Sequence, residues 1–212
     1  MIEYTRQQDL VDMDRLASIP ITIIGVGAVG SFTALALAKM GARNLTVYDP
    51  DVVEAHNLPN QFYRELDLGL MKVEALAGII EEHTQVTIQS KGVKYTNQEL
   101  SGIIIASPDN MEARKIIWRR VKHNTQAALF IDARMGAEVA RIYSLNPVED
   151  ASFYQETLYD SKEALQEPCT RRTIIYTVLG ISAFICGQVK KYMANEPVKK
   201  EIIIDFKLGV IP

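Results

Sequence analysis

Short apolar runs alternate along the chain with longer segments whose apolar residues recur at helical spacing. The β-branched runs 21–24 and 102–106 are typical of strands buried on both faces of a parallel sheet. The almost wholly apolar segment 31–40 predicts a buried helix, and the spacing after Asp67 predicts a helix that begins near this N-cap residue. Further strands are expected at 45–48, 86–90, 128–132, 137–145 and 201–208, and further helices around 10–16, 111–122, 153–165 and 173–193.

This order of elements predicts an α/β fold. Repeated strand–helix units favour a Rossmann-like, mostly parallel sheet with helices on both faces. The segment 137–145 alternates between apolar and polar residues, which indicates antiparallel strands added in the C-terminal part. The length of 212 residues suits a single domain, 1–212. The polar stretch 147–170 is expected to be a crossover loop that contacts the substrate.

Composition excludes several functional classes. The net charge of -3 gives no electrostatic case for binding nucleic acid or a membrane surface. The N-terminus shows no signal peptide, and the longest apolar run is shorter than the about 18 residues of a bilayer span. The two cysteines, Cys169 and Cys186, provide neither a disulfide framework nor a four-ligand zinc site. We therefore expect a reduced, cytoplasmic protein.

A glycine motif, GVGAVG, follows the first strand directly and opens the first buried helix. Gly25 allows a tight turn, Gly27 lets the backbone approach a phosphate, and Gly30 lets the helix pack on the strand. The helix N-terminus presents unpaired N–H groups and a positive dipole end to an anion. In this strand–turn–helix context the motif favours nucleotide binding over a mere turn.

Asp49 stands at the end of the second strand. An acid at this position can hydrogen-bond the hydroxyls of a ribose, although it can also simply cap the strand end. These features alone fit NAD as well as ATP.

Two further side chains have two interpretations each. Lys72 is expected in the first turns of a helix, where an ammonium group is unfavourable unless an anion is present, or else it is an exposed surface lysine. Asp109 follows a buried strand, where open α/β sheets bind ligands. It either caps the next helix or, if Asn110 is the cap, is available to hold Mg²⁺.

Several short motifs occur together in a fixed order: YTRQ, GVGAVG, DPDVVEAHNLPNQ, DLGLMKVEALAGI, SPDNMEAR and PCT. With these motifs the chain resembles the ThiF/MoeB/HesA family, the ubiquitin-activating-enzyme-like adenylyltransferases, over essentially its whole length. The resemblance implies an enzyme that uses ATP to adenylate the C-terminal glycine carboxylate of a ubiquitin-like or sulfur-carrier protein. The products would be an acyl-adenylate and pyrophosphate.

The resemblance also implies roles for individual residues. Asp109 would hold Mg²⁺, and Arg6 would reach a phosphate bound by the neighbouring subunit, which implies a homodimer. The other residues carried over as nucleotide ligands are Gly25, Gly27, Gly30, Asp49 for the ribose, Asp51, and Asn57, Gln61 and Lys72 for the phosphates.

Three departures from the family pattern stand out. Ala28 takes the place of a glycine, which is a mild change. Asn60 stands where the family usually has an arginine, so one cation beside the phosphates is missing, and Arg134 is a candidate replacement. The paired CxxC zinc ligands of many relatives are absent, which predicts a zinc-free minimal member.

Cys169 lies in PCTRRT, which looks like the sequence around the thioester-forming cysteine of some activating enzymes. The two arginines that follow would favour the thiolate if the geometry allows it. A loop cysteine without a catalytic part is an equally weighted alternative.

Other functions stay open from the sequence alone. The first alternative is an enzyme that adenylates a small carboxylate, a peptide terminus or a modified tRNA base, and the absence of a basic patch argues against the last. It can be a catalytically weak ATP-binding partner subunit, which Asn60 would permit. A dinucleotide-binding oxidoreductase is disfavoured by Lys72 and Asp109.

Overall fold

The computed structural model describes residues 3–159 and 173–211. Its centre is a seven-stranded sheet with the strand order β3-β2-β1-β4-β5-β6-β7. The first five strands pair in parallel, and the last two run antiparallel to their neighbours. Their bounds are β1 Ile21–Ile24, β2 Leu45–Tyr48, β3 Gln89–Lys91, β4 Gly102–Ala106, β5 Ala127–Gly136, β6 Val139–Leu145 and β7 Glu201–Asp205.

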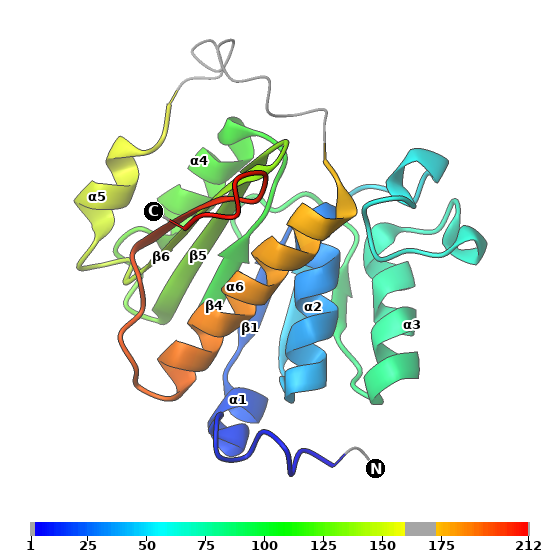
Figure 1. The fold of residues 1–212 in the computed structure, drawn as a ribbon, viewed down its shortest axis with the longest axis horizontal. Helices are drawn as coiled ribbons and strands as arrows, with labels where there is room; N and C mark the ends of the chain where they lie inside the picture. Colours follow the sequence, from blue (N-terminus) through cyan, green and yellow to red (C-terminus); the bar gives the residue numbers. More distant parts are fainter. Residues whose placement is uncertain (1–2, 160–172, 212) are drawn as a thin grey trace.

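Helices cover both faces of this sheet (Figure 1). On one face α6 packs against α2, and α2 packs against α3, over one large apolar cluster. On the other face α4 and α5 enclose a smaller, aromatic-rich cluster that includes Trp118, Phe130 and Tyr154. The bounds are α1 Met13–Ser18, α2 Ala28–Met40, α3 Lys72–Thr84, α4 Met111–Val121, α5 Ala151–Glu156 and α6 Ile175–Met193. The predicted Rossmann-like fold with C-terminal antiparallel strands is therefore confirmed.

The predicted helix start near Asp67 is wrong. Asp67 ends a short 3₁₀ helix, η2 (Glu65–Asp67), where its carboxylate accepts the backbone N–H of Arg64 at 2.8 Å. Gly69 follows with φ 82°, a left-handed conformation that cannot continue a right-handed helix. The helix therefore begins only at Lys72, with Met71 as its N-cap residue.

Other predicted boundaries also differ. The helix expected at 153–165 is α5, which ends at Glu156, and residues 160–172 lie outside the described part of the chain. The last strand ends at Asp205, where a turn begins and the Asp205 carboxylate accepts the N–H of Leu208 at 2.9 Å. The helix expected around 10–16 is α1, which begins only at Met13, so Leu10 precedes it and is 59% exposed, whereas Leu16 is fully buried.

Within residues 3–159 and 173–211, no helix is long and apolar enough to cross a membrane.

Candidate active site

The candidate site lies where β1 and β4 run side by side at the centre of the sheet. Ile24 and Ala106 are the last residues of these two strands and pair with each other. The strand order changes direction here, because β2 lies on one side of β1 and β4 on the other. Ligands of open α/β sheets bind in the crevice at such a point. A cavity of about 1930 Å³ opens there and extends across the ends of β2, β5 and β6.

Two glycines of the loop allow the backbone to pack closely. A Cβ added to Gly25, whose φ is +89°, would stand 2.7 Å from the carbonyl oxygen of Ser107. A Cβ on Gly30 would stand 2.0 Å from the carbonyl oxygen of Gly25. Gly27 differs, because the nearest atom to its added Cβ is Gln61 Nε2 at 3.9 Å. The space over Gly27, at the N-terminus of α2, is therefore open to the cavity.

Asp49 holds the glycine loop in place. Its carboxylate is buried and accepts the backbone N–H of Val26 at 2.8 Å and that of Asp51 at 3.0 Å. Tyr63 donates its hydroxyl hydrogen to the carbonyl of Val26 at 2.6 Å. Burial raises the pKa of Asp49 above its usual value, although the two N–H bonds act in the opposite direction. The sequence predicted a ribose ligand here and did not predict this second role.

Lys72 and Asp51 form an ion pair across the loop between β2 and α3. The distance from Lys72 Nζ to Asp51 Oδ2 is 2.9 Å, and the Lys72 backbone N–H donates to the Asp51 carbonyl at 2.9 Å. The Lys72 side chain is 8% exposed and that of Asp51 is 62% exposed. Lys72 is thus a buried lysine at the first position of a helix, not the exposed lysine of the alternative interpretation.

Three amide side chains from the loop 57–61 line the same cavity. Asn57 is buried, and its Oδ1 accepts the backbone N–H of Glu54 at 2.9 Å. Within the described residues, Asn60 Oδ1 and Gln61 Oε1 are buried side-chain oxygens without a hydrogen-bond partner. Asn60 Nδ2 donates to the hydroxyl of Thr173, just before α6. Asn60 therefore joins two segments far apart in the sequence.

Asn110, not Asp109, caps α4. Asn110 Oδ1 accepts the backbone N–H of Ala113 at 2.8 Å, and its Nδ2 donates to Asp109 Oδ1 at 2.7 Å. The capping alternative for Asp109 is therefore wrong. Asp109 is exposed at the cavity, next to the end of β4. Among the described residues no group of three or more His, Cys, Asp or Glu is placed to hold a metal ion.

A second charged network, which the sequence interpretation missed, surrounds Asp132 in the middle of β5, beside the carboxyl end of β4. Asp132 is fully buried and binds the Nε of Arg114 at 2.9 Å and the Nε of Arg134 at 2.7 Å. Its Oδ2 also accepts the hydroxyl hydrogen of Tyr154 at 2.9 Å. Arg114 donates a further hydrogen bond from Nη2 to the carbonyl of Ala133 at 2.9 Å. Asp132 is the last residue of the strand 128–132 that the sequence predicts, and an acid at such a position is a signal that could have identified it.

Arg134 is held firmly inside this network. Its Nη1 and Nη2 donate to the carbonyl and hydroxyl of Thr157 at 2.8 and 2.9 Å. Its guanidinium lies 4.7 Å from the ring centroid of Tyr143 and 5.6 Å from that of Tyr154. Because its three nitrogens all donate to protein oxygens, the geometry does not favour Arg134 as the missing phosphate-binding cation.

Comparison with known proteins identifies the family. The model of the ThiF family matches residues 4–202. The chain belongs to the ThiF family. The ubiquitin-like modifier-activating enzyme 5 of Drosophila mojavensis is 27% identical, and that of Drosophila grimshawi is 32% identical. Each match covers 90% of this chain and 54% of the relative, so the chain spans about half the length of these relatives.

Solved structures of the same fold are also similar. The structure of E. coli MccB with ATP has a TM-score of 0.76 at 18% identity and covers 94% of this chain and 64% of that chain. The structure of PaaA has a TM-score of 0.78 at 20% identity, with 100% of this chain and 68% of that chain covered. At this identity the two structures support the ThiF-type fold alone.

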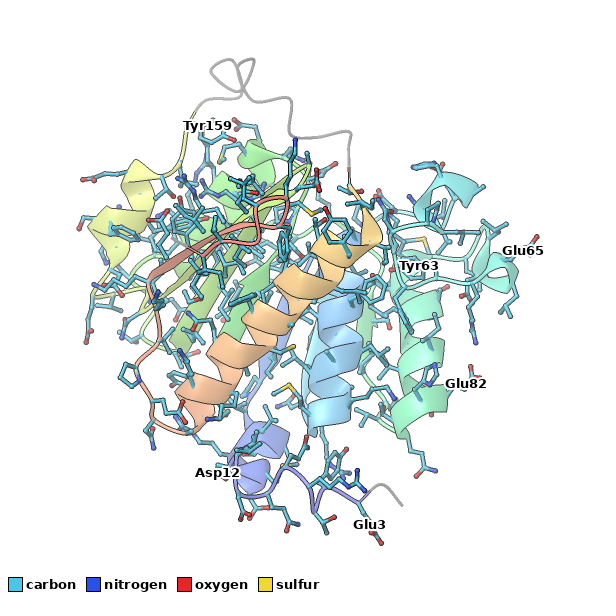
Figure 2. The ribbon with its side chains drawn as sticks, viewed as in Figure 1. Glu3, Asp12, Tyr63, Glu65, Glu82 and Tyr159 are labelled. Carbon is cyan, nitrogen blue, oxygen red and sulfur yellow. The ribbon has the colours of Figure 1, made fainter. Side chains whose placement is uncertain are left out.

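Arg6 does not line this cavity. Arg6 is exposed and lines a separate hollow with Glu3 and Lys39, at the C-terminal end of α2. Figure 2 shows Glu3 at the opposite end of the molecule from Tyr159, which lines the cavity. Cys169 lies outside the described residues. The remaining cysteine, Cys186, is buried in α6, and burial raises its pKa to about 12.

Proposed function

We propose that the chain is an ATP-dependent adenylyltransferase domain that activates the C-terminal glycine carboxylate of a ubiquitin-like or sulfur-carrier protein. The observation that supports this most is the composition of one cavity. Gly27 at the open N-terminus of α2, Lys72, Asp109 and the amides Asn57 and Gln61 all line it. A site for a nicotinamide has no evident use for this combination of a cation and an exposed carboxylate beside the glycine loop.

The binding of the triphosphate follows from charge and geometry. The N–H groups at the start of α2 are available to an anion because Gly27 adds no side chain over them. Lys72 supplies a positive charge next to this loop, and Asp49 keeps the loop in its bent conformation. When the triphosphate binds, Lys72 exchanges the exposed carboxylate of Asp51 for a phosphate oxygen.

Asp109 suits a Mg²⁺ ion that is bound together with the nucleotide. Mg²⁺ is usually held by one or two carboxylates, several waters and the phosphates of the substrate. A single exposed carboxylate that is not used as a helix cap fits this donor set. When bound, the ion neutralises the charge that spreads over the phosphates during the reaction.

The reaction needs positioning more than covalent catalysis. A carboxylate oxygen of the carrier attacks the α-phosphorus, the bond from this phosphorus to the bridging oxygen breaks, and pyrophosphate leaves with the electron pair. The carboxylate is already ionised, so no general base is required. Lys72 and the N–H groups of α2 stabilise the developing charge, and the walls of the cavity hold the two reactants in line.

We also propose a homodimer in which Arg6 completes the site of the partner. The distance from the hollow around Arg6 to the glycine loop is that between the two ends of α2, roughly 20 Å for 13 residues. Arg6 therefore contributes to a phosphate site only if it acts on a second copy. Substituting Arg6→Ala is expected to lower activity without weakening ATP binding to an isolated protomer.

ATP–pyrophosphate exchange against a panel of candidate carriers tests the activity. We expect exchange only with carriers that end in glycine, and none when that glycine is removed. Exchange with small carboxylates or free peptides would instead support the alternative substrates. Absence of exchange despite ATP binding would support a catalytically weak partner subunit, and binding of NADH but not ATP would reject the proposal.

Thioester formation on Cys169 is a separate step with its own test. In Cys169→Ala the only remaining cysteine is Cys186, whose raised pKa keeps its thiol protonated and unreactive at pH 8. We expect this variant to retain exchange and to lose any thiol-sensitive conjugate with the carrier. A conjugate that persists would reject the role of Cys169.

A further inference from the structure

The network around Asp132 carries an excess positive charge. Two guanidinium groups, Arg114 and Arg134, share the single carboxylate of Asp132. Tyr154 stays neutral, because burial and the neighbouring Asp132 raise its pKa well above its usual value. Within the described part of the chain, Asp132 is the one carboxylate in contact with either guanidinium.

No described ion pair joins this network to the other acids that line the cavity, which are Asp49, Asp51, Asp109, Glu156 and Glu201. Glu156 is exposed to solvent. Asp51 is paired with Lys72, and Glu201 lies 3.5 Å from the Nε of Arg141. Asp109 is exposed to solvent and bonded to Asn110. An uncompensated charge is costly on side chains as buried as those of Arg114 and Arg134, so the network favours an anion in the cavity.

The position of Arg114 indicates which anion this is. Arg114 lies on α4, one turn beyond its cap, and its side chain is 9% exposed and lines the cavity. The triphosphate is expected on the other side of the β4 end, over the glycine loop and near Lys72. A group that reaches Arg114 therefore lies on the β5 side of the expected triphosphate, and on this side the cavity extends past Arg134 to β6.

We infer that Arg114 receives the terminal carboxylate of the substrate, and that Arg134 supplies the excess charge that makes this possible. This inference rests on the proposed function. A planar guanidinium matches a carboxylate in shape and donor geometry, and Arg114 uses Nε and Nη2 for its described contacts, which leaves Nη1 for the substrate. The contact is made before the reaction, so it acts on substrate binding more than on turnover.

Arg134 is a positioning residue that does not touch the substrate. It binds Asp132 Oδ2, while Arg114 binds Oδ1, and Thr157 and the tyrosine rings fix its other contacts. Without Arg134, Asp132 and Arg114 would form a neutral pair. The affinity of Arg114 for an anion would then decrease although Arg114 itself is intact.

The test uses the full chain and two simple probes, glycylglycine and glycylglycinamide. They are titrated in the presence of a non-hydrolysable ATP analogue while the side-chain Nε–H signals of arginine are followed by NMR. We expect the Arg114 signal to shift with glycylglycine and not with the amide. An equal response to both probes would overturn the inference, because the amide lacks the negative charge.

The decisive variant is Arg134→Met, which leaves Arg114 in place. We expect glycylglycine to bind roughly tenfold more weakly, since one unit charge is lost a few ångströms away, with ATP affinity unchanged. Arg15→Met is the matched control, because Arg15 also lies over a tyrosine ring, 4.9 Å from the Tyr192 centroid, but lines no part of the cavity. Arg114→Lys keeps the charge and should retain part of the binding. Circular dichroism establishes that each variant is folded.

Two results would separate this inference from the proposed function. If ATP affinity decreases in Arg134→Met as much as that of glycylglycine, the network is a phosphate site and the inference is wrong. If no carrier supports pyrophosphate exchange while glycylglycine still shifts the Arg114 signal, the carboxylate site stands and the proposed reaction is wrong.

Discussion

Two charged networks border the cavity, one at the β2 side and one at the β5 side, and they differ in almost every physical respect. The β2-side network consists of Asp51 and Lys72, joined by one side-chain bond of 2.9 Å with Asp51 largely exposed. The β5-side network places Asp132 at zero exposure between two arginines and a tyrosine hydroxyl. In the first network the Lys72 ammonium has one described side-chain partner, which a ligand can replace. In the second network the buried carboxylate of Asp132 is held by three side chains at once.

This difference suggests that the two networks have different roles in binding. An exposed partner such as Asp51 can return to water at little cost, so Lys72 can exchange it for a phosphate. A buried network cannot rearrange cheaply, because each lost partner leaves a desolvated charge. It is therefore suited to provide a fixed field for an incoming substrate, as expected of a preorganised site.

The largest expected effect is on stability and uses one substitution, Asp→Asn, in both networks. Asp132→Asn leaves two buried guanidinium groups without a carboxylate, and we expect a loss of about 3–5 kcal/mol in the free energy of unfolding. Asp51→Asn removes an ion pair with one exposed partner, and a loss of about 1 kcal/mol or less is expected. Urea denaturation of the two variants measures both values.

A similar loss of stability in Asp132→Asn and Asp51→Asn would contradict this difference between the two networks. Such a result would show that the network on the β5 side relaxes or admits water when its acid is removed. The Arg134→Met variant is a useful reference, because it removes one cation and leaves Arg114 and Asp132 as a neutral pair.

The next largest effect is on activity. In Lys72→Met the cation that is expected to contact the phosphates is lost, and pyrophosphate exchange should decrease about 10²–10³-fold. Lys39→Met serves as the control, since Lys39 lies in the last turn of α2 and lines the hollow near Arg6 instead. An unchanged exchange rate in Lys72→Met would mean that Lys72 pairs with Asp51 for structural reasons and does not contact the phosphates.

The fold was predictable from local patterns because each segment carries its own signal. β4 was predicted with the bounds that the structure shows, since its β-branched residues are buried on both faces of the sheet. The start of α3 was not predicted, because Gly69 and the side-chain bonds of Asp67 interrupt a periodicity that continues on both sides.

The site was predictable in part, for a similar reason. The glycine loop, Asp49 and Asp109 follow strand ends, where the chain position alone indicates a ligand site. The contacts of Asp132 with Arg114 and Arg134 were not predictable, because they join α4 and β5 through side-chain geometry. The contact of Asn60 with Thr173 spans 113 positions, and no local pattern contains it.

The smallest expected effect concerns Asp49, a third acid whose described hydrogen bonds come from N–H groups instead of cations. Burial raises the pKa of Asp49, so the folded protein keeps this proton at pH values where the unfolded chain has lost it. The resulting stabilisation is fully present below the unfolded pKa and is lost as the pH rises through the folded pKa. Asp49→Asn cannot titrate, so its unfolding free energy lacks this contribution at every pH.

The difference in unfolding free energy, wild type minus Asp49→Asn, should therefore increase as the pH is lowered from 7 toward 4. Its slope has an upper limit of about 1.4 kcal/mol per pH unit, the linkage value for one proton. Urea titrations at several pH values measure it, and the constant loss of one acceptor in the variant cancels from the slope. A difference that decreases on acidification would show that the N–H bonds from Val26 and Asp51 outweigh burial, and that Asp49 acts as an anionic clamp on the glycine loop.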